Sequence, residues 1–261
     1  MTTDKILRSQ SNTAILVVSC DAYQDLWPPF FHCFFKYWPD CPYPLYLGSN
    51  IATYDDPRVA SIAIGTDLDY SSNLLKMLSN IEEEWVILWI EDRPPSRAVR
   101  TDRILHMIDT AKAQDAVYLK LIPNLPRALG NADIGEVPKG TRYRVGMTVA
   151  LWRKSFLKQF LRPGESAWEI EYDGVKRADM SDEKFFALGM RVSDPPLKDI
   201  HLVAKGRIIR EAIPFLKSEG VLHYLSLRKP ISLRFYLYAK LNLFFWSVVY
   251  FFRQQRDKLG L

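Results

Sequence analysis

Residues 85–90 read WVILWI, six consecutive apolar residues that stop abruptly at the sequence EDRPP, residues 91–95. A short apolar run bounded by turn residues is typical of a strand buried on both faces of a sheet. Upstream, Thr13–Ser19 (TAILVVS) has the same character and stops at Cys20-Asp21. We therefore expect two interior strands, each with a carboxylate close to its end.

Similar apolar runs alternate with helical patterns along the first half of the chain. Strand-like runs occupy residues 44–48, 59–64 and 116–122, whereas helices are predicted over 27–37, 71–81 and 100–113. This alternation predicts an α/β fold, in which a Rossmann-type, mostly parallel sheet is flanked by helices. Farther along, the pattern predicts a strand over 143–152 and a short helix near 154–161.

The charge of the chain is unevenly placed. Of 261 residues, 48% are hydrophobic and 25% charged, which is typical of a globular protein, and the net charge is +5. From residue 205 onward there are eleven basic and three acidic residues, a local +8 that leaves −3 for residues 1–204. We therefore expect a ligand-binding domain over 1–204 and a basic, aromatic, helical C-terminal segment over 205–261. Three cysteines without a CxxC pair favour a reducing, cytoplasmic location.

Polar residues follow three of the predicted strands: Asp21, then Ser49-Asn50, then Glu91-Asp92. Ligands of open α/β sheets bind at the carboxyl ends of the strands, so these residues are candidates for a ribose, diphosphate or cation site. The competing interpretation is that strand ends are polar only because they meet solvent. Neither GxGxxG nor GxxxxGK[ST] occurs, which argues against dinucleotide oxidoreductases and P-loop enzymes.

Three segments carry a family resemblance. They are VVSCDAYQDLWPPFFHCFFKYWPDCPYPLYLGSN, WVILWIEDR and YRVGMTVALWRKSFLKQFLRPGESAWEIE. Together these segments, spanning roughly residues 13–175, resemble bacterial glycosyltransferases of the GT-A type that build cell-surface polysaccharides. The resemblance implies a GT-A-like fold and a nucleotide-sugar donor.

The resemblance also implies roles for individual residues. Asp21 and Tyr23 would hold the base and ribose of the donor, with Asn50 beside them. Glu91-Asp92 would stand in place of the family's DxD motif, with Asp92 as a ligand of Mg²⁺ or Mn²⁺. Arg93 departs from that motif, and a guanidinium there could neutralise phosphate directly, so metal dependence stays open. Arg144 is a further candidate for the diphosphate, the alternative being an ordinary ion-pair arginine.

Inverting sugar transfer needs one carboxylate as general base, and Glu169 and Glu171 in SAWEIE are the candidates. On a helix, residues two apart do not face the same way, so only one of them would point into the site. Trp168 offers a flat apolar face for an acceptor sugar. Alternatively, Ser166 caps a helix and Glu169 completes a capping box, which is a purely structural role.

The C-terminal segment contains FYLYAKLNLFFWSVVYFF, residues 235–252, flanked by Lys and Arg. Its uninterrupted apolar part, residues 243–252, would extend roughly 15 Å as a helix, half of a ~30 Å hydrocarbon core. Its apolar residues could be buried in either of two ways: against an anionic membrane surface, or against protein, which would be its own domain or a second copy of the chain. We expect peripheral association with the inner face of the plasma membrane and no nucleic-acid partner.

These observations predict a glycosyltransferase of cell-envelope polysaccharide assembly, using a nucleotide-sugar donor and a glycan or lipid-linked acceptor. The alternative is a catalytically silent peripheral membrane scaffold of a glycan-assembly complex, which the incomplete DxD motif favours.

Overall fold

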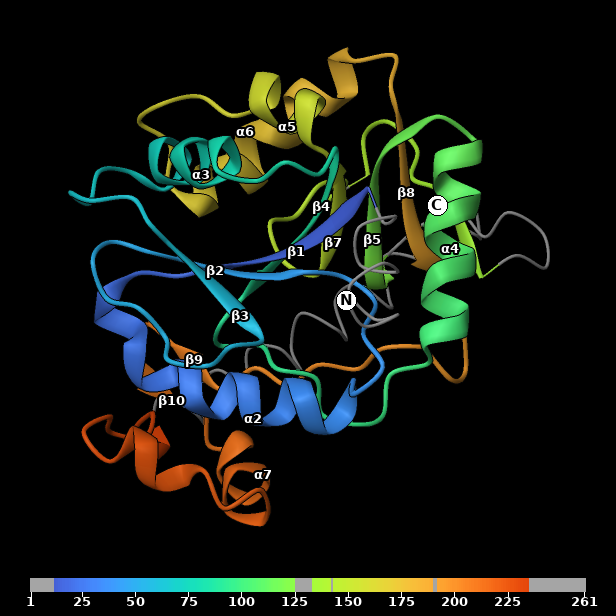
Figure 1. Ribbon diagram of the computed structural model, residues 1–261. Coiled ribbons are helices and arrows are strands. Elements are labelled where there is room, and N and C mark those ends of the chain that lie inside the picture. Colours follow the sequence, from blue (N-terminus) through green and yellow to red (C-terminus); the bar gives the residue numbers. More distant parts are fainter. Residues whose placement is uncertain (1–11, 125–132, 142, 190–191, 235–261) are drawn as a thin grey trace, which may run out of the picture. The chain divides into compact units, whose positions relative to one another are not determined.

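The computed structural model describes residues 12–124, 133–141, 143–189 and 192–234 (Figure 1). The chain divides into two compact units, Met1–Ile200 and His201–Leu261, and each is described by itself. The aromatic stretch 235–252, for which a membrane-associated helix was predicted, lies outside the described residues.

The first unit is built on an eight-stranded sheet with the order β3-β2-β1-β4-β7-β5-β8-β6. The strands are β1 (Thr13–Val18), β2 (Leu45–Ser49), β3 (Val59–Ala63), β4 (Trp85–Ile90), β5 (Ala116–Asn124), β6 (Ile134–Glu136), β7 (Ala150–Arg153) and β8 (Lys184–Gly189). The pairs β1/β2, β1/β4, β2/β3 and β5/β8 are parallel, whereas β7 and β6 run antiparallel to their neighbours. The predicted α/β fold with a mostly parallel sheet is confirmed.

Helices cover both faces of this sheet (Figure 1). Alternate residues of β1 point to opposite faces: Ile15 and Val17 join a core with α2 (Trp27–Tyr37) and α4 (Thr101–Ala113). Ala14 and Leu16 join a second core with α3 (Tyr70–Ser79), α5 (Lys154–Phe160) and α6 (Ala167–Met180). Both cores close the sheet to water, and all six residues of β1 are buried as expected for an interior strand.

Two local predictions need correction. The helix predicted over 71–81 spans Tyr70–Ser79 instead, and it is capped by Asp69, whose carboxylate accepts from the Ser72 amide at 2.9 Å. The strand predicted over 143–152 begins only at Ala150, because Tyr143 (φ 58°) and Val149 (φ 47°) both adopt left-handed backbone conformations that interrupt an extended chain. The segment before β7 is therefore a loop along the carboxyl edge of the sheet.

The second unit contains a hairpin of β9 (Val203–Ala204) and β10 (Arg207–Ile208), followed by α7 (Ala212–Ser218) and the 3-10 turn η2 (Leu222–Leu225). The hairpin turn is Lys205-Gly206, and both residues have positive φ, 50° and 73°. Residues 229–231 run beside β10, with the Ile208 amide donating to the Lys229 carbonyl at 3.1 Å and the Ile231 amide to the Ile208 carbonyl at 2.9 Å. None of the helices in the described residues is both long and apolar enough to cross a membrane.

Candidate functional site

The carboxyl ends of β1 and β2 meet through Asp21, which opens the 3-10 turn η1 (Asp21–Leu26). Its carboxylate accepts hydrogen bonds from the backbone amides of Asn50, Ile51 and Ala52 at 3.0–3.1 Å. In return the Asp21 amide donates to Asn50 Oδ1 at 3.1 Å. The structure therefore brings Asp21 and Asn50 together, and it engages the Asp21 carboxylate with the protein backbone. Tyr23, two residues on, is half-buried in the same turn.

The end of β4 carries Glu91, Asp92 and Arg93. Glu91 is only 8% exposed, which is unusual for a carboxylate and places it inside the protein at the sheet edge. Arg93 Nε donates to Asp199 Oδ2 at 2.5 Å, so a carboxylate distant in the sequence offsets part of the guanidinium charge. The Asp199 partner was not predicted, because 106 residues separate it from Arg93 and nothing local marks the pair.

A lysine that the sequence analysis missed lies at the centre of this edge. Lys120 is on β5, and Gly146 follows in the loop before β7. A Cβ atom added to Gly146 would lie 3.2 Å from Lys120 Nζ, 3.4 Å from Glu171 Oε1 and 3.8 Å from the Tyr118 hydroxyl. These three polar ends therefore converge on one point, and a Cβ atom there would require the Lys120 ammonium to shift by a few tenths of an ångström. A charged residue inside the apolar run AVYLKLI is the signal that could have identified Lys120.

Burial lowers the pKa of the Lys120 ammonium below its ordinary value of 10.5. The Glu171 and Asp199 carboxylates act in the opposite direction, and the positive charge of Arg93 lowers the pKa further. These charged groups come from different parts of the chain: Lys120 from β5, Glu171 from α6, Arg93 from the residues after β4, and Asp199 from the segment before Ile200. Lys120 is thus a half-buried cation among groups of both signs.

Tyr70, at the start of α3, belongs to the same cluster. Burial raises the pKa of its phenol, and the Glu91 and Glu171 carboxylates raise it further. Its hydroxyl is buried and has no hydrogen-bond partner among the described residues. A buried donor without a partner costs free energy, on the order of 1–3 kcal/mol. This hydroxyl is thus available to a ligand or a water molecule.

The two candidate bases on α6 have different surroundings. Glu169 is exposed and forms the capping box: its Oε2 accepts from the Ser166 amide at 2.8 Å, and Ser166 Oγ accepts from the Glu169 amide at 3.3 Å. The hydrogen bonds from Ser166 lower the pKa of the Glu169 carboxyl. Glu171 is half-buried, with Oε1 3.5 Å from the Met147 amide nitrogen. The capping-box interpretation of Glu169 is confirmed, and Glu171 is the carboxylate that reaches the cluster.

Trp168 is 71% exposed, and it lies one helical turn before Glu171 on α6. Its indole is therefore accessible to solvent near the edge at which Glu171 enters the cluster. The predicted contact with an acceptor sugar remains a prediction.

Arg144 lies apart from that convergence. Its side chain is 1% exposed, its Nε donates to the Val137 carbonyl at 3.0 Å, and Nη1 donates to the Ala178 carbonyl and, at 3.2 Å, to Asp179. The guanidinium also lies 4.5 Å from the Phe185 ring. These contacts give Arg144 a structural role in joining α6 to the sheet, and its predicted contact with the donor stays a prediction.

The carboxylates of the site could supply one or two ligands of a metal ion, but not a complete set. Among the residues the structure describes, no three or more His, Cys, Asp or Glu side chains are grouped so that they could hold a metal ion. Magnesium shared with a substrate diphosphate, however, commonly needs only one or two protein carboxylates. Glu91 and Asp92, adjacent at the end of β4, fit that smaller requirement.

No protein-family model and no curated protein sequence matches the chain. Among solved structures, a cytidylyltransferase from Leptospira borgpetersenii superposes with a TM-score of 0.48 at 11% identity, over 85% of this chain and 100% of the other. The 2-C-methyl-D-erythritol 4-phosphate cytidylyltransferase of Francisella tularensis gives a TM-score of 0.45 at 12% identity, over 80% and 100%.

Residues 1–349 of TarS from S. aureus give a TM-score of 0.43 at 11% identity. The match covers 68% of this chain and only 60% of that TarS fragment. Other structures of the same TarS fragment are complexes with UDP-GlcNAc and with UDP. All three likenesses are distant, so the chemistry of the present chain is argued from its own residues.

Proposed function

We propose that this chain is an inverting glycosyltransferase that moves a sugar from a nucleotide-sugar donor to a hydroxyl of a glycan or lipid-linked acceptor in cell-envelope polysaccharide assembly. The observation that carries the proposal is the placement of Glu171. Its carboxylate reaches the carboxyl edge of the sheet beside the half-buried Lys120, whereas Glu169 is engaged in capping its own helix. One carboxylate at a ligand-binding edge, next to one cation, is what a base-assisted displacement from a diphosphate requires.

In this reaction the acceptor oxygen attacks the anomeric carbon of the donor sugar. The bond between that carbon and the diphosphate oxygen breaks, and its electron pair leaves with the nucleoside diphosphate. The proton of the acceptor hydroxyl passes to the Glu171 carboxylate. No redox change occurs, and the proton is later released to water.

Lys120 would stabilise the leaving group, because the nucleoside diphosphate gains negative charge as the bond breaks. A half-buried ammonium acts on such a charge more strongly than a fully exposed one, since less water screens it. Arg93, already paired with Asp199, would contribute less. Asp21, Tyr23 and Asn50 would shape the pocket for the base and ribose at the ends of β1 and β2.

When Mg²⁺ or Mn²⁺ is bound, it supplies further neutralisation of the donor diphosphate. Asp92, with Glu91 beside it, is the residue that would hold the ion.

The acceptor would enter beside α6. Trp168 presents an exposed aromatic face on which the C–H groups of a sugar can stack. The Tyr70 hydroxyl, buried beside Glu91 and Glu171, would donate a hydrogen bond to a sugar oxygen.

A donor screen tests the proposal. Calorimetry of the full chain with UDP-, GDP-, dTDP- and CMP-linked sugars, with Mg²⁺ or EDTA, should reveal one donor that binds, and slow release of its nucleotide without acceptor. Absence of binding and of hydrolysis for every donor would refute a glycosyltransferase and support the silent scaffold. The screen includes nucleoside triphosphates with sugar phosphates, because release of pyrophosphate from that mixture would identify nucleotidyl transfer instead.

A further inference from the structure

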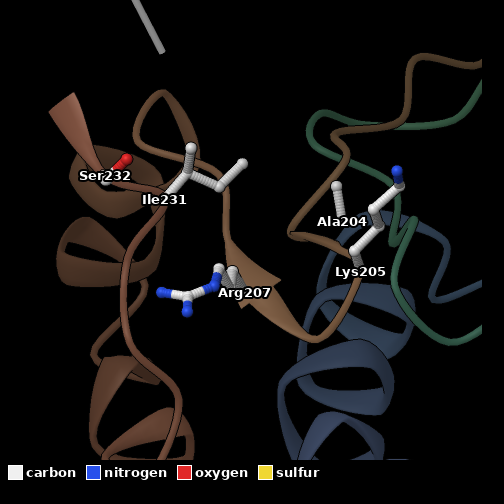
Figure 2. Close-up of a pocket in the computed structure, with 5 residues that line it drawn as sticks. All are labelled: Ala204, Lys205, Arg207, Ile231 and Ser232. Atoms are coloured by element: carbon white, nitrogen blue, oxygen red, sulfur yellow. The ribbon is translucent and has the colours of Figure 1, made fainter. Parts of the chain in front are cut away.

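The second unit contains a cavity of about 440 Å³ that the proposed reaction does not use. Its described lining consists of Ala204, Lys205, Arg207, Ile231 and Ser232. In Figure 2, Ile231 and Ser232 lie on one side, Ala204 and Lys205 on the other, and Arg207 lies between them. The cavity is thus bounded by the β9–β10 hairpin and the segment that runs beside β10.

The cavity combines apolar walls with two cations. Ala204 and Ile231 contribute apolar surface, while Lys205 and Arg207 are exposed. Among the described residues, neither of these two side chains makes a hydrogen bond or an ion pair, whereas the neighbouring Arg210 donates to the Ile231 carbonyl at 2.7 Å. Two cations that have no counter-charge in the described part of the chain, beside an apolar wall, fit an anionic amphiphile.

The charge of the surrounding surface has the same sign. Residues 201–234 contain seven basic and two acidic residues, a net +5. Leu227 (94% exposed) and Leu233 (55% exposed) lie on either side of the lining residues Ile231 and Ser232 in the sequence. Exposed leucines beside unneutralised cations are typical of protein surfaces that rest on an anionic leaflet.

Other occupants match this chemistry less well. Residues 235–261 carry four basic residues and one acidic residue. If that segment occupied the cavity, its net positive charge would lie against the positive charges of Lys205 and Arg207. A nucleic acid would supply phosphates but no aliphatic chain for the apolar walls. A lipid with a phosphate headgroup supplies both.

We propose that the cavity at the β9–β10 hairpin binds the phosphate headgroup of an anionic membrane lipid, with Lys205 and Arg207 contacting the phosphate. This inference is independent of the proposed transfer reaction. It assigns membrane docking to described residues of the second unit.

The test is co-sedimentation of the full chain with vesicles of phosphatidylcholine, with or without phosphatidylglycerol. Each cation near an anionic leaflet contributes about fivefold in binding, so Lys205→Ala with Arg207→Ala should weaken binding to the anionic vesicles roughly 25-fold. The matched control is Lys158→Ala with Lys217→Ala, which removes two exposed lysines that are not among the described lining residues and should leave binding nearly unchanged.

A third variant, Ala204→Phe, fills the cavity without changing charge and should also weaken binding. Equal losses in the cavity and control double variants would mean a diffuse electrostatic attraction and would overturn the proposal, as would wild-type binding by Ala204→Phe. If the full chain bound a single-stranded oligonucleotide and phosphatidylglycerol vesicles did not displace that oligonucleotide, nucleic acid would be identified as the ligand instead. Donor binding measured on the cavity variants should be unaltered, which separates this result from any failure of the transferase proposal.

Discussion

Replacing Glu171 with glutamine removes the proposed base while keeping its shape. The amide oxygen can still lie near the Met147 amide, 3.5 Å from Glu171 Oε1, so we expect the fold and donor affinity to be retained. The amide cannot accept the acceptor proton, so turnover should fall by roughly 10²–10⁴-fold, or about 2.7–5.5 kcal/mol of transition-state stabilisation. The loss should appear in kcat, because ground-state binding does not use the base.

The matched control is Glu169→Gln, two residues away on the same helix. Its amide oxygen can still accept from the Ser166 amide, so the capping box persists in part, and activity should stay within about twofold of the wild type. The assay is the initial rate of nucleoside diphosphate release with donor and acceptor both present, together with the donor Kd from calorimetry. Near-normal turnover in Glu171→Gln, or equal losses in both variants, would refute the assignment.

Two further predictions concern Lys120 and Gly48. Lys120→Gln should weaken donor binding roughly 10- to 100-fold, because a hydrogen bond between charged groups contributes about 1.5–3 kcal/mol. In the wild type, donor affinity should fall as the pH rises through the lowered pKa of Lys120, since only the protonated side chain is a cation. Gly48→Ala should destabilise the protein by about 1–3 kcal/mol in thermal unfolding, because its Cβ would lie 2.2 Å from the sulfur of the buried Met77.

Each of these has a clear contrary result. An affinity profile that stays flat until the pH exceeds the ordinary lysine pKa of 10.5, or unchanged affinity in Lys120→Gln, would separate Lys120 from the diphosphate. For Gly48→Ala, adding Met77→Ala should relieve the clash, so the two changes together should destabilise less than the sum of each alone. If the two destabilisations were simply additive, the methyl group introduced by Gly48→Ala and the Met77 side chain would not clash.

The sequence predicted the sheet well because buried parallel strands are a local signal. Trp85–Ile90 is apolar throughout and forms β4 with the predicted bounds. Similarly, the helix predicted over 27–37 forms α2 with those bounds and has Pro28 and Pro29 in its first turn. Its Phe30 and Phe34 rings pack edge-on against Trp89. The fold was therefore accessible from short windows of sequence.

The candidate site was accessible only in part, because its members meet through the tertiary structure. Asp21 and Asn50 were predicted from the strand ends, and the structure joins them by hydrogen bonds. The choice between Glu169 and Glu171 needed the orientation of α6, which helical spacing alone does not fix. Lys120 was missed because its significance depends on a glycine in another loop and a carboxylate on another helix.

The hydrogen bonds of Asp21 affect how mutational scans of this protein should be interpreted. Its carboxylate fastens the Asn50–Ala52 turn to the end of β1, so removing it would release three backbone amides at once. Loss of activity on substitution of Asp21 would therefore be expected whether or not the residue ever contacts a ligand. A deep mutational scan would rank the position as essential, and only a ligand titration of a variant that remains folded would separate loop anchoring from recognition.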